Sequence, residues 1–497
     1  MRKSLSLFLL VFFFVKLGVH AQQNPKREFR GAWIQCVNNQ FQGLGRDRMQ
    51  ETLTYQLDEL QRTGINTIIF QVRAEGDALY PSAYEPWSRF LTGRQGVAPA
   101  PYWDPLAWMI QEAHKRGMEL HAWINPFRAK TKGTPALTSP YYNAHPDRFF
   151  EYDGLWIFDP AIPENRDYIC FIVQDIISRY DVDGLHIDDY FYPYPVAGLP
   201  IPDGHSYQRY GQGQNIQDWR RQNVNTFMKQ LSQTIRQTKP WVKFSVSPFG
   251  IYRNQKSDPA GSRTNGLQNY DDLYADILLW VREGWVDLNI PQIYWQIGHP
   301  AADYEELIRW WNEHAPQRPL IVGQDVERTV KYAATDGSGA TQTLQKYNLQ
   351  RRMSNVAGSC QWYAKACVDN PQGYATTLRQ TFHSTIALQP EMPWIDKKAP
   401  RKVRGIKLLW TQDGPILMWR VPRRNKKEMQ TARKYVVYRF AKGQQQDLGN
   451  PANIHAITTQ PFLKLDYEGG KQQWTYVVTA LDRMQNESKG KKKTIRL

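Results

Sequence analysis

The sequence predicts a (β/α)8 barrel followed by a small all-β sandwich. Three observations predict it: strand-like runs alternate with helical patterns eight times, no glycine-rich phosphate loop follows any strand, and short β-type runs replace the helices near the C-terminus. Strands that alternate with helices form parallel sheets, and eight such units close into a barrel. The alternative is a doubly wound open sheet, which the missing phosphate loop disfavours.

The composition is that of a globular protein rich in aromatic residues. The chain has 497 residues, of which 41% are hydrophobic and 22% are charged, with 18 Trp, 27 Tyr and 20 Phe. At about 100–200 residues per domain, this length fits one large domain and a smaller companion. The aromatic content excludes a disordered chain. A single long apolar run, at the N-terminus, excludes a polytopic membrane protein.

Residues 1–21 have the features of a signal peptide in the required order. A basic start precedes an apolar stretch from Leu5 to Val15, and a small-residue cleavage site ends at Ala21. The stretch is too short for a comfortable membrane span. We therefore expect export to the periplasm or the extracellular space, a mature chain that begins at Gln22, and no stable membrane insertion after cleavage.

The barrel prediction covers residues 27–394 and names eight strands in chain order. They are FRGAWIQCV from Phe29, NTIIFQVR from Asn66, MELHAWIN from Met118, DGLHID from Asp183, VKFSVS from Val242, VDLNIPQIY from Val286, PLIVGQ from Pro319 and GSCQWY from Gly358. Helical periodicity predicts helices within residues 49–64, 104–117, 165–180, 224–238, 270–284, 304–314, 343–353 and 374–382. Several of these patterns end at Gly, a common helix C-cap.

A Pro- and Lys-rich linker from Glu391 separates the barrel from a second domain at residues 400–497. There the runs IKLLW, PILMWRV, KYVVYRF, HAITT, FLKLDY and WTYVVTAL predict short strands. About a hundred residues of such strands are typical of a sandwich of the immunoglobulin or fibronectin III kind. We expect Trp419 and Tyr438 in its core, and we interpret the domain as a spacer or packing partner.

The formal charge of the chain is +16. We interpret it as solubility plus a local basic tail at Lys489, Lys491, Lys492 and Lys493, with the remaining charge scattered. No nucleic-acid motif accompanies the charge, so no nucleic-acid partner is expected.

Neither the cysteines nor the histidines predict a metal site. Four cysteines are too few for a disulfide scaffold, and a Cys36–Cys360 disulfide and buried free thiols both stay open. His114, His121 and His186 lack clustered spacing, which disfavours a metal-dependent deacetylase. We expect no metal and no cofactor.

The most informative motif is DGLHIDDYFYPYP, from Asp183. In a (β/α)8 barrel the reactive groups lie at the C-terminal ends of the strands, which is where Asp188 and Asp189 fall. Two adjacent carboxylates raise each other's proton affinity, which suits one of them to an acid or base role. We predict Asp188 as the principal catalytic carboxylate. Asp189, Glu75, Asp77 and Asp325 stay open as its partner.

Aromatic and hydrogen-bonding side chains recur on the other predicted barrel loops. Flat aromatic faces beside polar groups suit sugar rings, whose C–H faces pack on π systems while their hydroxyls take polar partners. Period-two alternation along the strands predicts that many of these side chains point into one mouth. The predicted substrate-binding residues are Arg73, Trp33, His121, Asn125, His186, Tyr190, Tyr192, Gln292, Tyr294 and Trp295.

At these residues the chain resembles the glycosyl-hydrolase-like family 10. The similar blocks are FRGAWI, FQVRAEGDALY, HAWINPFR, DGLHIDDYFYP, FSVSPFGIYR and DLNIPQIYWQ, between about Arg27 and Trp394. The resemblance implies a secreted or envelope bacterial protein with a TIM-type barrel and glycoside hydrolase action, with cell-wall glycan of the peptidoglycan type as the suggested substrate. The C-terminal domain resembles fibronectin type III in its order of strands.

One departure keeps a second hypothesis open. Barrel glycosidases commonly carry an acid/base carboxylate on strand four, five or six, yet SVSPFG and PQIYWQ have none at their ends. A non-catalytic glycan-binding protein with a degenerate glycosidase site is therefore the alternative to a glycosidase with paired carboxylates.

Overall fold

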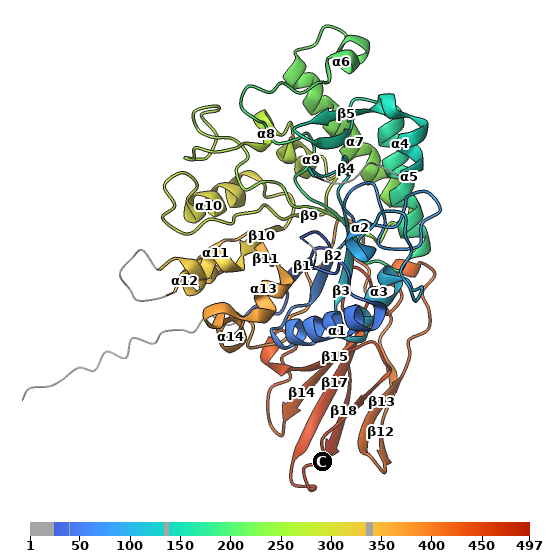
Figure 1. The fold of residues 1–497 in the computed structure, drawn as a ribbon. Helices are drawn as coiled ribbons and strands as arrows, with labels where there is room; N and C mark the ends of the chain where they lie inside the picture. The colour runs from blue at the N-terminus through green and yellow to red at the C-terminus, as the bar shows by residue number, and fades with distance from the viewer. Residues whose placement is uncertain (1–23, 39, 134–138, 334–340) are drawn as a thin grey trace, which may run out of the picture.

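The computed structural model describes residues 24–38, 40–133, 139–333 and 341–497. The expected signal peptide lies outside the described residues. The structure contains a closed barrel of eight parallel strands surrounded by helices, and a β-rich module packed against one end of it (Figure 1). The predicted barrel with additional C-terminal sheets is therefore confirmed at this level.

The barrel strands follow each other around the barrel in chain order. Their order is β1-β2-β3-β7-β8-β9-β10-β11, and β11 pairs with β1 to close the ring. The bounds are β1 Phe29–Ile34, β2 Thr67–Arg73, β3 Glu119–Ile124, β7 Gly184–Ile187, β8 Lys243–Val246, β9 Leu288–Asn289, β10 Leu320–Asp325 and β11 Val356–Trp362. Six lie within the predicted runs, whereas β10 extends one residue beyond its run, to Asp325, and β11 begins two residues before its run, at Val356.

The longer helices lie where helical periodicity predicted them. They are α1 Arg46–Arg62, α3 Pro105–Lys115, α5 Pro163–Arg179, α7 Ile216–Thr238, α10 Tyr304–His314, α12 Gln342–Arg352 and α14 Tyr374–Gln380. Shorter helices are α2 Arg89–Thr92, α4 Pro140–Ala144, α6 Gly204–Tyr210, α8 Asn269–Asp272, α9 Ile277–Arg282, α11 Val326–Lys331 and α13 Ala364–Asp369.

The helix expected within residues 270–284 is divided into α8 and α9. Tyr274 has a positive φ of 56°, which a helix interior does not accept. Asp276 then caps α9 by accepting a hydrogen bond from the Leu279 amide at 3.1 Å. Asp276 therefore starts a new helix instead of continuing the first one.

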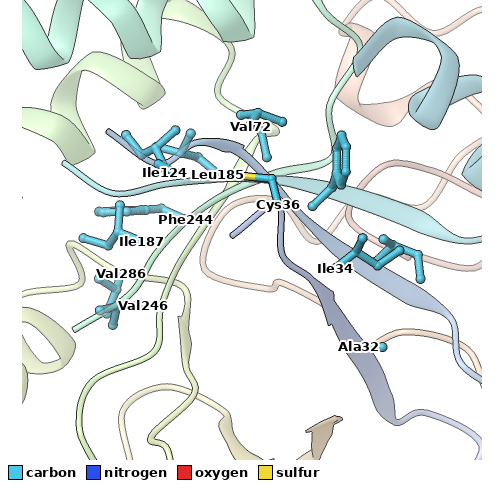
Figure 2. Close-up of a cluster of buried hydrophobic side chains, with 14 of the residues drawn as sticks. Ala32, Ile34, Cys36, Val72, Ile124, Leu185, Ile187, Phe244, Val246 and Val286 are labelled. Carbon is cyan, nitrogen blue, oxygen red and sulfur yellow. The ribbon is translucent and has the colours of Figure 1, made fainter. Parts of the chain in front are cut away.

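Alternation along the strands divides their side chains into two sets. Ala32, Ile34, Leu185, Ile187, Phe244 and Val246 belong to the apolar layer between the barrel and its helices (Figure 2). The intervening residues point inward, and several of them are polar, among them His186 and Ser245. The polar interior is the scaffold on which the mouth is built.

A small antiparallel sheet is inserted between β3 and α5 and was not predicted. Its strands are β4 Arg128–Lys130, β5 Phe149–Tyr152 and β6 Leu155–Phe158, in the order β4-β6-β5. Each strand has only three or four residues, too few for a readable alternation. The insertion follows the C-terminal end of β3, so it lies at the barrel mouth.

The C-terminal module consists of two antiparallel sheets. One has the order β12-β13-β16 and the other β15-β14-β17-β18. The bounds are β12 Arg404–Thr411, β13 Gly414–Arg420, β14 Lys434–Ala441, β15 Ile454–Thr458, β16 Phe462–Lys464, β17 Gln473–Leu481 and β18 Lys491–Arg496. Leu417 and Trp419 of one sheet share an apolar core with Val437 and Val478 of the other, whereas Tyr438 packs in a second apolar cluster of the module.

The basic segment near the C-terminus is an edge strand, which corrects its interpretation as a tail. Lys491, Lys492 and Lys493 belong to β18, which pairs with β17. Ile495 and Leu497 are buried in the module core and hold the strand in place. Exposed lysines are common on edge strands because they discourage pairing with another chain. The lysine-rich sequence was therefore interpreted as a tail although it forms a strand.

The module closes the N-terminal end of the barrel. Met484, in the loop between β17 and β18, is fully buried in one cluster with Phe29, Ile69 and Leu288 of the barrel interior. The neighbouring Gln485 Nε2 donates to Glu119 Oε1 at 2.6 Å. The module is thus a packing partner that fills the barrel floor.

Two further expectations are answered by the fold. Cys36, Cys170, Cys360 and Cys367 are all free and buried, so no Cys36–Cys360 disulfide is formed. Within the described part of the chain, no helix has the length and apolar character needed to cross a membrane.

Candidate active site

Asp188 lies directly after β7, at the barrel mouth. β3 and β7 pair with Trp123 beside His186, so the inward positions that follow, Asn125 and Asp188, are neighbours too. Trp123 Nε1 donates to Asp188 Oδ2 at 3.0 Å. The Asn125 amide, oriented with its nitrogen toward the carboxylate, donates to Oδ1 at 2.9 Å. Both oxygens of this buried carboxylate therefore accept hydrogen bonds from β3 and the residue after it.

Asp189 is buried beside Asp188 and has a different set of partners. Gln292 Nε2, from the segment after β9, donates to Asp189 Oδ1 at 3.0 Å and also to the Ser247 carbonyl at 2.9 Å. The Tyr194 hydroxyl donates to Asp189 Oδ2. Because Tyr194 is partly exposed, Asp189 is connected to the outer part of the mouth.

The two carboxylates influence each other's protonation. Burial and, after it, the negative charge of Asp189 raise the pKa of Asp188 above its ordinary value. Burial also raises the pKa of Asp189, while hydrogen bonds from Tyr194 and Gln292 oppose the shift. Arg128 lowers both pKa values by its positive charge. Two buried carboxylates this close resist ionising together, which favours one shared proton.

Aromatic rings surround the pair on two sides. On one side Trp362 lies between Trp33 and Trp123, each with its ring centroid 6.2 Å away, and is stacked on Tyr294 at 6.3 Å. On the other side the aromatic contacts run from Tyr190 through Tyr194 and Phe249 to Trp295. This arrangement offers flat apolar faces on both sides of a carboxylate pair.

A cavity of about 230 Å³ lies beside the Asp189 loop. Arg128 and the rings of Tyr190 and Tyr194 form part of its wall, and Leu155 and Ile157 of β6 form another part. The Arg128 guanidinium is 3.7 Å from the centre of the Tyr190 ring, a cation–π contact. The inserted β4-β6-β5 sheet therefore helps to shape the mouth.

Glu75 and Asp77 belong to a network separate from the aspartate pair. Arg89 donates to both oxygens of Glu75, at 2.7 and 3.0 Å, and the Thr131 amide donates to Glu75 Oε1 at 2.8 Å. Asp77 is fully buried and accepts from the Glu75 amide at 2.9 Å. Burial and the charge of Glu75 raise the pKa of Asp77 to about 6. These contacts tie Glu75 and Asp77 to the loop after β2 and to Thr131.

Arg73 does not reach the mouth, because a β-bulge reverses its direction. Gln71 is paired with Trp123, but Arg73 is paired with Ile124, whose side chain lies in the outer apolar layer (Figure 2). Arg73 is fully buried and forms a bidentate ion pair with Glu85, with N–O distances from 2.8 to 3.0 Å. It stabilises the loop after β2.

His186 and Trp33 lie deeper in the barrel than a sugar could reach. Trp33 Nε1 donates to His186 Nε2 at 3.1 Å, and the Ser247 hydroxyl lies 2.9 Å from the same nitrogen. His186 Nδ1 lies 2.8 Å from Ser245 Oγ, which it meets as a donor. Burial and His121 lower the pKa of His186 well below its ordinary value, so the imidazole is neutral.

Two other predicted binding residues are buried, and Asp325 has a local role. His121 is fully buried below His186, with Nε2 3.3 Å from Glu119 Oε2. Tyr192 is fully buried and packs against Tyr274 at a ring-centroid distance of 5.1 Å. Asp325 caps α11 by accepting from the Arg328 amide at 2.8 Å. The structure thus brings Asn125, Tyr190, Gln292, Tyr294 and Trp295 toward the aspartate pair. Tyr192 lines only the cavity beside the Asp189 loop, and His121 and Asp325 lie away from the pair.

Sequence reasoning did not include four residues of the mouth among its candidates. They are Trp123, Arg128, Tyr194 and Trp362. Strand alternation does place Trp123 on the inward face of β3 with Asn125, although Trp123 is not among the predicted binding residues. Trp362 ends β11, the eighth barrel strand, where an aromatic residue is a signal for the mouth.

Among the described residues no three His, Cys, Asp or Glu side chains are arranged to hold a metal ion. The arrangement at the mouth is that of two carboxylates with aromatic walls. It can move one proton and can stabilise a positive charge that develops between those walls.

Comparison with known proteins identifies a family. The family model described as Glycosyl hydrolase-like 10 matches residues 28–333. Glycosyl hydrolase YngK of Bacillus subtilis (strain 168) is 39% identical over 97% of this chain and 96% of its own length. Glycosyl hydrolase DigH of Escherichia coli (strain K12) is 39% identical over 58% of this chain and 70% of its own length.

Among solved structures, the PgaB (BpsB) glycoside hydrolase domain of Bordetella bronchiseptica is 12% identical, with a TM-score of 0.44 over 71% of this chain and 98% of that one. The family match covers more than half of this chain, and the relative from Bacillus subtilis spans nearly all of it. The chain belongs to the Glycosyl hydrolase-like 10 family.

Proposed function

We propose that this protein is an exported glycoside hydrolase that cleaves glycosidic bonds in a bacterial cell-wall glycan of the peptidoglycan type. The observation that carries the proposal is the adjacent pair Asp188 and Asp189, buried at the C-terminal end of the fourth barrel strand between two groups of aromatic rings. The names of the relatives and the leader-like residues 1–21 support it further.

In this proposal the two aspartates have different roles. Asp189 is connected to the outer mouth through Tyr194, and the proton that the pair shares is given from this side to the leaving-group oxygen. Asp188 is held as an acceptor by Trp123 and Asn125, so it presents negative charge to the oxocarbenium-like transition state once that proton has been given away. Trp362 and Tyr294 offer the sugar a stacking surface.

The test is a panel of purified cell-wall glycan strands, with and without peptide stems, incubated with the mature chain. We expect new reducing ends on at least one of these substrates, and none with a double variant of Asp188→Asn and Asp189→Asn. Binding without any new reducing ends would favour the glycan-binding alternative. Turnover only on glycans unrelated to the cell wall would retain the glycosidase and overturn the substrate.

A further inference from the structure

The positive charge of the chain is concentrated in the C-terminal module. Residues 400–497 contain 21 Lys and Arg against seven Asp and Glu, so this segment carries +14 of the formal charge of +16. The charge is therefore not scattered, contrary to the sequence-based expectation. A charge so unevenly divided points to an anionic partner for the module, distinct from whatever the barrel mouth binds.

One face of the module combines cations with exposed apolar side chains. Residues paired across antiparallel strands share a face of the sheet. On the outer face of β12-β13-β16, pairing places in three rows Arg404 and Arg420, then Lys407, Met418 and Phe462, then Leu409, Ile416 and Lys464. We call these eight residues the basic–apolar face.

The apolar members of the basic–apolar face are unusually accessible. Leu409, Met418 and Phe462, one on each strand of the sheet, are 50%, 40% and 46% exposed. No carboxylate occurs in the three rows, and among the described residues no ion pair is formed by the four cations. An outer sheet face that served only solubility would be polar throughout.

We propose that the basic–apolar face binds peripherally to a membrane surface rich in anionic phospholipid. Each Lys or Arg near such a surface strengthens binding about fivefold, the equivalent of about 1 kcal/mol. Leu409, Met418 and Phe462 can enter the boundary between headgroups and acyl chains, where burial of apolar area adds to the attraction. A soluble polyanion would use the cations but gain little from leucine and methionine, so the lipid surface fits the whole face better.

Two more aromatic residues lie at the end of the same sheet. Trp410 and Tyr467 are 52% and 60% exposed, with ring centroids 5.3 Å apart. Exposed Trp and Tyr are typical of the headgroup level of membranes. The module packs on the N-terminal end of the barrel, opposite the mouth (Figure 1). Membrane binding would therefore leave the mouth accessible.

The experiment is co-sedimentation of the chain from Gln22 onward with vesicles of phosphatidylcholine, with or without phosphatidylglycerol. We expect binding only with phosphatidylglycerol and a steep decrease with added salt. A double variant of Lys407→Glu and Lys464→Glu should bind about 25-fold more weakly or worse, because two fivefold contributions are lost. Arg48→Glu with Lys229→Glu, on exposed positions of α1 and α7, changes the net charge equally and should bind like the wild type.

The apolar contribution is tested with Leu409→Ser and Phe462→Ser in one chain. We expect several-fold weaker binding to the anionic vesicles, and a thermal unfolding midpoint within a few degrees of the wild type shows that the module is folded. Equal loss in the matched control, absence of binding to phosphatidylglycerol, or full binding by the serine variant would each overturn the proposal. Full competition by soluble polyglutamate at equal charge would assign the face to a polyanion instead. None of the changed residues lies at the mouth, so the outcome is independent of the proposed hydrolase activity.

Discussion

Replacement of Asp188 by Asn is the most direct test of the proposed chemistry. Asn is nearly the same size, so the packing around the site is kept. Its oxygen can keep the hydrogen bond from Trp123 Nε1, which now lies 3.0 Å from the carboxylate, and its amide nitrogen can donate to Asn125 once that amide turns its oxygen inward. The loss of a carboxylate beside Asp189 also relieves the repulsion within the pair. The variant should therefore fold.

The expected loss is in the rate. A carboxylate that stabilises positive charge in the transition state contributes about 10²–10⁴-fold, or about 3–5 kcal/mol of activation free energy at about 1.4 kcal/mol per tenfold. The assay measures kcat/KM on an aryl glycoside and on the natural glycan, with circular dichroism as the check of folding. Because the aryl leaving group needs little protonation, it should rescue Asp189→Asn but not Asp188→Asn.

The pH profile gives an independent readout. As the general acid, Asp189 must be protonated, so activity should fall as the pH rises through its pKa. Removal of the neighbouring negative charge lowers that pKa, so the residual activity of Asp188→Asn should decline at a lower pH than in the wild type. Asp175→Asn on α5 is the matched control. A folded Asp188→Asn chain with full activity and an unchanged pH profile would refute the mechanism.

Three further predictions follow from single contacts. Trp123→Phe keeps an aromatic side chain but removes a donor to Asp188, so kcat should fall about 10-fold in steady-state kinetics. Urea unfolding measures separately the stability lost because the phenyl ring is smaller than the indole. Met484→Ala leaves a void in the barrel floor and should lower the free energy of unfolding by about 2–4 kcal/mol without changing KM; an unchanged urea midpoint would contradict the closing role of the module. Asp77 has a folded-state pKa of about 6, above the unfolded value of about 3.9, so the unfolded chain ionises first and stability should fall by about 3 kcal/mol between about pH 4 and pH 6. Asp159 and Asp482 also have pKa values raised to about 6, so Asp77→Asn should reduce the decrease in that interval by about this amount without abolishing it. A variant whose stability decreases as steeply as that of the wild type would show that Asp77 does not contribute.

The parts of the site that could be predicted depend on regular strand geometry. Alternation and parallel register place Asn125 beside Asp188 once β3 and β7 are neighbours. The same rule failed for Arg73, because a bulge between Gln71 and Arg73 turns the Arg73 side chain to the outer face of the barrel. The residue pattern of β2 contains no signal for this bulge. The rule also says nothing about Tyr192, which lies on a loop whose aromatic residues are divided between core and mouth by tertiary packing.

The fold was predictable where periodicity was long and not where contacts were long-range. The eight barrel units each have a readable run, whereas the β4-β6-β5 sheet consists of strands of three or four residues. The insertion of Met484 into the barrel floor depends on a single apolar residue in a polar loop. A single methionine in a loop carries no sequence signal for burial, and its packing role is seen only in the structure in which the module contacts the barrel.

The neutral state of His186 explains how the aspartate pair can hold a proton. A charged imidazole on the same inward face of β7 would stabilise the Asp188 carboxylate and draw its pKa down. Instead Trp33 donates to His186 Nε2, which fixes that nitrogen as an acceptor, and burial keeps the ring uncharged. The charged groups Glu119 and Lys243 pair with each other one layer further down. The polar interior thus separates the compensated charges of the barrel floor from the carboxylates at the mouth, and it leaves burial and mutual repulsion to raise the proton affinity of the pair.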